Sequence, residues 1–290
     1  MASVFSGQWL KIVSFTDRQF FLLAVVIYGL STLYSVFLWR KGFRQHDRIN
    51  YMLLLIGFAF HTTAMAQRGF SFHRCPVQGI LEATMFLGWA LVTAYLLVGL
   101  LPRLRFLGAF ASPGLFAIGL FVVVFWNDPG LGPRPELSGQ LKILHWLTSL
   151  HAALTLLAYG AFGLSAVSGI MYLTQERDLK FHKPRAVFSL LPPIQRLESI
   201  TSRSLLVGFI LLTVGLAIGG HLPRPEGVSY LQDAKVIWSL FLWLLYFTLL
   251  VSRWRFAQTG RRFACASIGA FAFVLLTFWG TNLLSPLHHP

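Results

Sequence analysis

Three ionisable side chains stand inside long apolar stretches of the sequence: His61, Glu82 and His151. Such groups are costly in a hydrophobic environment and are a functional hypothesis by default. A neutral imidazole binds metal ions, and haem iron takes one or two such axial ligands. His151 and Tyr159 are eight residues apart and share one helical face. For His151 two interpretations are equally open, an axial ligand of haem iron or a structural histidine that donates to a neighbouring carbonyl.

The other candidate residues also have two interpretations each. His61 is either a ligand or a buried structural histidine. Glu82 lies near the start of a predicted helix, where a carboxylate either caps the helix dipole or orients an imidazole. His288 and His289 directly follow the last apolar run, so they either ligate iron or form a solvated tail. We favour His288, which is closer to the helix end.

The motifs of common enzyme classes are missing from the sequence. We find no activated nucleophile, metal-ligand cluster or phosphate-binding loop, and we therefore expect no enzymatic activity. Cys75 and Cys265 belong to no C-x-x-C pair, which excludes a thiol oxidoreductase of that type. No C-x-x-C-H haem-attachment motif is present, so any haem is expected to be haem b, held noncovalently.

The elements that position these residues are predicted to be membrane-spanning helices. The chain is 56% hydrophobic and only 12% charged, whereas a soluble domain carries roughly 25% charged residues. Lipid offers no partner for an open backbone, so each long apolar run is expected to be helical. The prediction is an all-α polytopic bundle forming one integral membrane domain, residues 1–290. We expect eight spans at roughly 20–39, 50–67, 80–101, 106–126, 144–173, 204–220, 236–252 and 263–284.

The basic residues predict the orientation of the bundle. The net charge is +14, but the Lys and Arg residues sit in short loops between apolar runs, which argues against nucleic-acid binding. Sixteen of the 24 follow the odd-numbered spans and eight lie on the opposite side. By the positive-inside rule the first set is cytoplasmic. Both termini are then outside, in a bacterial cytoplasmic (inner) membrane, and the longer, aromatic-rich loops form the outer face.

Three segments, in order along the chain, carry a resemblance to a known family. Pro76 to Trp89 is similar to its P-x5-E-x3-F-x2-W segment, with Glu82 as the acid. His151 to Tyr159 is similar to its L-H-x7-Y helix, and Asp233 to Trp243 resembles the end of its tryptophan-rich motif. On these segments the chain resembles, over nearly its whole length, cytochrome c assembly proteins of the CcsA/CcmC/HemX group, and most closely their small eight-span bacterial branch.

The resemblance implies a function and a set of site residues. Family members bind haem at the outer face of the membrane and pass it toward apocytochrome c. By position, His151 and His288 correspond to the two outer axial ligands, and His61 to an intramembrane histidine. The expected partners are membrane lipid, haem, apocytochrome c and another assembly subunit. The residues that would contribute to haem binding are His151, His288, His61, Glu82, Tyr230, Asp233 and Trp238.

The chain also departs from the family pattern. The segment Gly227 to Asp233 holds Tyr230 as its one aromatic residue, where the family has several tryptophans. The histidine that follows the motif in the family is absent from Phe247 to Trp254. Two alternatives therefore stay open. One is a HemX-like accessory protein that influences haem supply without ligating haem, and the other is an unrelated small-molecule transporter.

Overall fold

The computed structural model describes residues 16–40, 47–71, 75–77, 79–126, 141–181, 192–222, 233–256 and 258–283. Every regular element in these ranges is helical, as the sequence predicted. The elements are α1 (Asp17–Arg40), α2 (Asp47–Ser71), α3 (Ile80–Gly99), the short 3-10 helix η2 (Pro102–Leu107), α4 (Gly108–Val124), α5 (Leu141–Lys180), α6 (Ile194–Gly219), α7 (Ala234–Arg255) and α8 (Gly260–Leu283).

Within the described ranges, eight helical segments are long and apolar enough to cross a membrane. This confirms the predicted number and order of spans. Three boundaries were wrong by more than a turn: the end of α2, found at residue 71 and predicted at 67, the end of α5, and the start of α6. Helix α5 is 40 residues long, about 60 Å at 1.5 Å per residue, and so exceeds the hydrocarbon thickness of about 30 Å. Helix α6 begins ten residues before the predicted span and includes Arg196 and Arg203, which the sequence analysis assigned to a loop.

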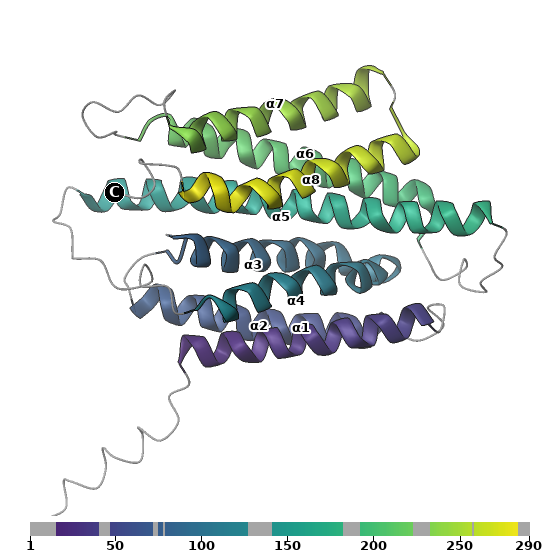
Figure 1. Ribbon diagram of the computed structural model, residues 1–290, viewed down its shortest axis with the longest axis horizontal. Helices are drawn as coiled ribbons and strands as arrows, with labels where there is room; N and C mark the ends of the chain where they lie inside the picture. Colours follow the sequence, from purple (N-terminus) through teal and green to yellow (C-terminus); the bar gives the residue numbers. More distant parts are fainter. Residues whose placement is uncertain are drawn as a thin grey trace, which may run out of the picture.

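Helix α5 lies at the centre of the bundle. Figure 1 shows α1–α4 on one side of it and α6–α8 on the other. Helix α3 packs against α5 from the first group, whereas α6 and α8 pack against it from the second. Successive helices run in opposite directions, so the starts of α1, α3, α5 and α7 share one end of the bundle with the last turns of α2, α4, α6 and α8. We call this the outer end, following the predicted topology.

Small and hydroxyl-bearing residues allow the helices around α5 to approach closely. A Cβ atom on Gly160 of α5 would lie 2.6 Å from the Ala90 Cβ atom on α3, so this crossing requires glycine. On the other side, Ser165 Oγ lies 2.7 Å from Ser267 Oγ on α8 and donates to the Thr201 carbonyl of α6. Interhelical hydrogen bonds and small residues are the usual basis of helix packing in lipid, where the hydrophobic effect does not drive association.

Candidate functional site

His151 lies near the outer end of α5 and faces α6. Its Nδ1 atom is 2.7 Å from the carbonyl oxygen of Gly215. A carbonyl only accepts hydrogen bonds, so Nδ1 carries the ring hydrogen and donates it. In the neutral ring this leaves the lone pair on Nε2, which is the state in which histidine ligates a metal. The structure thus shows the carbonyl contact of the structural interpretation, and the same contact leaves Nε2 as the ring nitrogen without a hydrogen.

An aromatic cluster lies deeper in the bundle than His151. Tyr159, two turns further along α5, makes edge-on contacts with Trp238 of α7 and Phe278 of α8, with ring centroids 6.0 and 6.1 Å apart. The indole Nε1 of Trp238 donates to Thr277 Oγ1 at 2.7 Å and so links α7 to α8. These three rings are buried and connect α5, α7 and α8 at this level.

The start of α7 lies beside this cluster. Asp233 is fully buried and is the N-cap residue of α7, where its Oδ1 accepts from the backbone N–H groups of Lys235 and Val236. Lys235 lies in the first turn of α7, directly after this cap. The structure therefore brings His151, Asp233 and Trp238 to one region at the outer end of α5–α8. In this region Asp233 fixes the helix start and Trp238 joins two helices.

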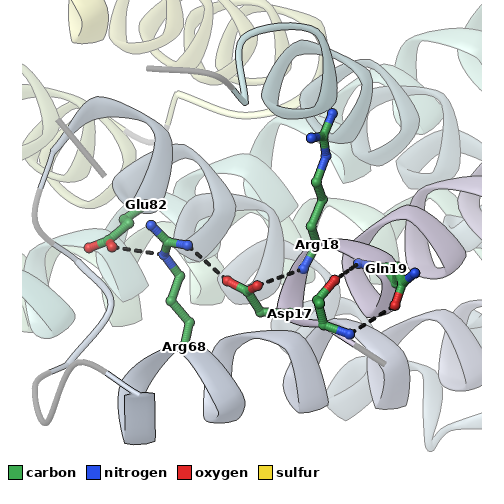
Figure 2. A network of polar contacts seen from close by, with 6 residues as sticks. Asp17, Arg18, Gln19, Arg68 and Glu82 are labelled. Atoms are coloured by element: carbon green, nitrogen blue, oxygen red, sulfur yellow. Dashed lines mark hydrogen bonds and ion pairs between the residues drawn. The ribbon is translucent and has the colours of Figure 1, made fainter. Parts of the chain in front are cut away.

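Glu82 lies in the other helix group, and its partner is an arginine that the sequence analysis had placed in a loop. Arg68 belongs to the last turn of α2, and its Nε atom donates to Glu82 Oε1 at 2.8 Å. Its second guanidinium branch donates to Asp17 Oδ2 at 2.8 Å. Figure 2 shows Arg68 between the two carboxylates, which come from the starts of α1 and α3. Glu82 therefore belongs to an ion network that ties three helices together, a role that the sequence analysis missed.

A signal for Arg68 was available in the sequence. Arg68 follows His61 by seven residues, two helical turns, which places both on one face of α2. In the structure both side chains are buried, together with Leu54 and Ala64 of the same face. The prediction missed Arg68 because it ended the span at residue 67, whereas α2 continues to residue 71.

His61 is enclosed between α1, α2 and α3. It is 2% exposed, its Nδ1 atom is 3.3 Å from the Tyr28 hydroxyl, and the Phe21 ring meets it edge-on at 5.0 Å. The carbonyl of Met85 on α3 is near enough to act on the ring, although it does not meet hydrogen-bond geometry. Among the described residues, no hydrogen-bond partner reaches Nε2. His61 is thus buried within the α1–α4 group, away from the α5–α6 contact of His151.

Two predicted site residues, Tyr230 and His288, lie outside the described residues, and so does the alternative His289. Of the proposed axial pair, the structure therefore describes His151 and not His288. In the described part of the chain, no three His, Cys, Asp or Glu side chains gather as ligands for a metal ion. A single imidazole whose Nδ1 is held by a carbonyl, as in His151, has the chemistry that haem iron needs from one or two ligands.

Comparison with known proteins identifies the family of this chain. The sequence model of the family described as "Cytochrome C assembly protein" matches residues 77–289. "Protein HemX" of Bacillus subtilis (strain 168) is 26% identical over 265 residues, which cover 91% of this chain and 94% of the relative. "Cytochrome c biogenesis protein CcsA" of Trieres chinensis is 25% identical over 291 residues, which cover 91% of each. The match spans well over half of the sequence, and the chain belongs to the cytochrome c assembly protein family.

Proposed function

We propose that this protein handles haem for cytochrome c maturation and presents it at the outer face of the membrane. Membership of the cytochrome c assembly family supports the role in maturation, and the name of the CcsA relatives, cytochrome c biogenesis protein, supports the same process. The cargo is haem b, held noncovalently, since the chain has no attachment motif. Binding and release need no covalent step by the protein, which fits a carrier and not an enzyme.

The observation that carries the proposal is the hydrogen bond from His151 Nδ1 to the Gly215 carbonyl. Metal-ligating histidines almost always donate their other ring N–H to a carboxylate, a carbonyl or water, because this fixes the tautomer and raises the basicity of the ligand. The 2.7 Å contact gives His151 this arrangement. When bound, haem supplies an iron that takes the Nε2 lone pair. The contribution of the chain is to orient that atom, through the contact of Nδ1 with the Gly215 carbonyl.

The second axial ligand in this proposal is His288. Helix α8 runs to the same end of the bundle as His151, and its Phe278 contacts Tyr159 of α5. The helix continues from Phe278 to Leu283, a further rise of about 7.5 Å toward the outer end. This direction supports a ligand from the segment that follows α8. The remaining proposed partners are apocytochrome c, another assembly subunit and the lipid of a bacterial cytoplasmic membrane.

A second candidate function is that of a HemX-like accessory protein that influences haem supply without ligating haem. Two observations favour it. Tyr230 is the one aromatic residue where the resembled family has several tryptophans, and two relatives that match over 91% of this chain carry the name HemX. The two functions differ in one property that is simple to measure, the presence of haem on the purified protein.

The test is the visible spectrum of protein purified in detergent from haem-replete cells. We expect a low-spin Soret band that acidic organic solvent extracts, and we expect the His151→Ala variant to lose it, with partial recovery in imidazole. The matched control is His221→Ala. His221 directly follows α6 at the outer end of the bundle, its side chain is exposed, and its ring contacts the Ala217 carbonyl of α6. Variants of His46 and His182 should also keep the spectrum. Colourless wild-type protein would favour the accessory function, and an unchanged His151→Ala spectrum would refute the axial role.

A further inference from the structure

The His151 ring is held against a glycine of α6. A Cβ atom built on Gly219 would lie 2.6 Å from His151 Cε1 and 2.7 Å from Nδ1, but 3.4 Å from Nε2. Carbon atoms in contact are normally about 3.5–4.0 Å apart, so a methyl group at this position would overlap the ring. The three distances also show that the Nδ1–Cε1 edge faces α6 and that Nε2 lies farther from it.

The neighbouring glycines of α6 do not contact the ring in this way. A Cβ atom on Gly215 would meet Thr155 Cγ2 at 2.8 Å, and the contribution of Gly215 to the ring is its carbonyl. A Cβ atom on Gly220 would lie 3.6 Å from the nearest carbonyl oxygens, which is ordinary contact. Gly219 is thus the position among these three where an added methyl group collides with the imidazole.

The helix end itself acts on the ring. Gly215 belongs to the last turns of α6, which ends at Gly219, and the carbonyl end of a helix carries a partial negative charge. A carbonyl at this end is a strong acceptor for the Nδ1 hydrogen and makes the imidazole a better donor at Nε2. Space from Gly219 and charge from the helix end therefore act on the same ring edge.

From these contacts we infer that the last turns of α6 form an orienting slot for His151. The Gly215 carbonyl holds Nδ1 and so leaves Nε2 as the coordinating atom, and Gly219 is a positioning residue because its missing side chain makes room for the ring. The inference rests on the proposed function, because it concerns the same ligand. It adds a direction: iron held by Nε2 would lie on the side of the ring away from the Gly215 carbonyl, because the two ring nitrogens point in different directions. His221, which follows α6 and contacts the Ala217 carbonyl, is therefore not expected to be the second ligand.

The experiment compares Gly219→Ala with the matched control Gly220→Ala in detergent-purified protein. Gly219→Ala should displace the ring and weaken haem retention about 10- to 100-fold, the usual range when a group that orients a ligating histidine is changed. The low-spin signal in electron paramagnetic resonance should fall in the same proportion. Gly220→Ala should retain the wild-type haem content and spectrum.

A second measurement separates positioning from folding. His151→Gly leaves a space that exogenous imidazole fills, and we expect imidazole titration to restore a low-spin spectrum. Adding Gly219→Ala to this variant narrows the slot. Imidazole should then bind at least about tenfold more weakly, within the same 10- to 100-fold range. Adding Gly220→Ala should leave imidazole binding unchanged.

The outcomes distinguish this inference from the proposed function. If wild-type protein holds no haem, or if His151→Ala keeps the wild-type spectrum, the proposed function fails and the inference fails with it. If His151→Ala loses the spectrum while Gly219→Ala matches Gly220→Ala, the proposed function stands and the slot is refuted. Equal imidazole affinity in the His151→Gly protein with and without Gly219→Ala would also overturn the slot.

Discussion

The ion network at the outer end of α1–α3 gives a quantitative prediction. Arg68 bonds Glu82 and Asp17, each at 2.8 Å, and its side chain is 5% exposed. The Glu82 side chain is fully buried, whereas that of Asp17 is 27% exposed. The guanidinium also lies 5.7 Å from the centre of the Trp126 ring. The perturbation that tests this arrangement is Arg68→Ala, which removes the cation between the two carboxylates.

The expected loss follows from the burial of the two carboxylates. Removing one member of a buried ion pair typically costs about 3–5 kcal/mol, because the other charge stays buried without it. That cost applies to Glu82, while the more exposed Asp17 contributes at most about 1 kcal/mol. We therefore expect Arg68→Ala to lower the free energy of unfolding by about 3–5 kcal/mol. The double variant Arg68→Met with Glu82→Leu should recover most of this loss, because apolar replacements of similar size are often neutral.

The assay is unfolding by sodium dodecyl sulfate in mixed micelles, followed by tryptophan fluorescence. The control is Arg18→Ala. Arg18 is next to Asp17 in the sequence, but its side chain is exposed and points away from Arg68 and Glu82 in Figure 2. A change at such a surface position usually stays within about 0.5 kcal/mol. If Arg68→Ala unfolds at the same detergent concentration as the control, the network does not stabilise the bundle as argued. The same holds if the double variant is as unstable as the single one.

Two further predictions concern topology and packing. A reporter fused after Pro290 should be active outside the cytoplasm and one inserted near Lys183 inside it, because of the distribution of basic residues; reversed activities would place the proposed site on the wrong side. Gly208→Ala should destabilise the protein by about 1–3 kcal/mol, because the new Cβ atom would lie 2.5 Å from the Phe162 ring. The control Gly114→Ala has open space around the new Cβ atom and should not destabilise the protein. Thermal stability in detergent measures both variants, and equal melting temperatures would contradict the packing.

The helix limits show where sequence reasoning succeeds and fails. An apolar run in lipid must form its own backbone hydrogen bonds, so the first span, predicted at 20–39, is found as Asp17–Arg40. The start of α6 was wrong because Arg196 and Arg203 were taken for loop residues. In the structure this charged turn is part of the helix, and its Glu198 lies 2.9 Å from Arg253 of α7. A charge with a partner on another helix can extend a helix beyond its apolar run.

The sequence by itself determined that His61, Glu82 and His151 stand in membrane helices, because an ionisable residue within an apolar run is visible without any structure. Only the tertiary structure decided their partners. Glu82 meets Arg68 from α2, and His151 meets the carbonyl of Gly215, 64 residues away on α6. Such contacts depend on how each helix is rotated and where it crosses its neighbour. The periodicity of one segment tells which of its faces is apolar, but not which atom of another helix that face will meet.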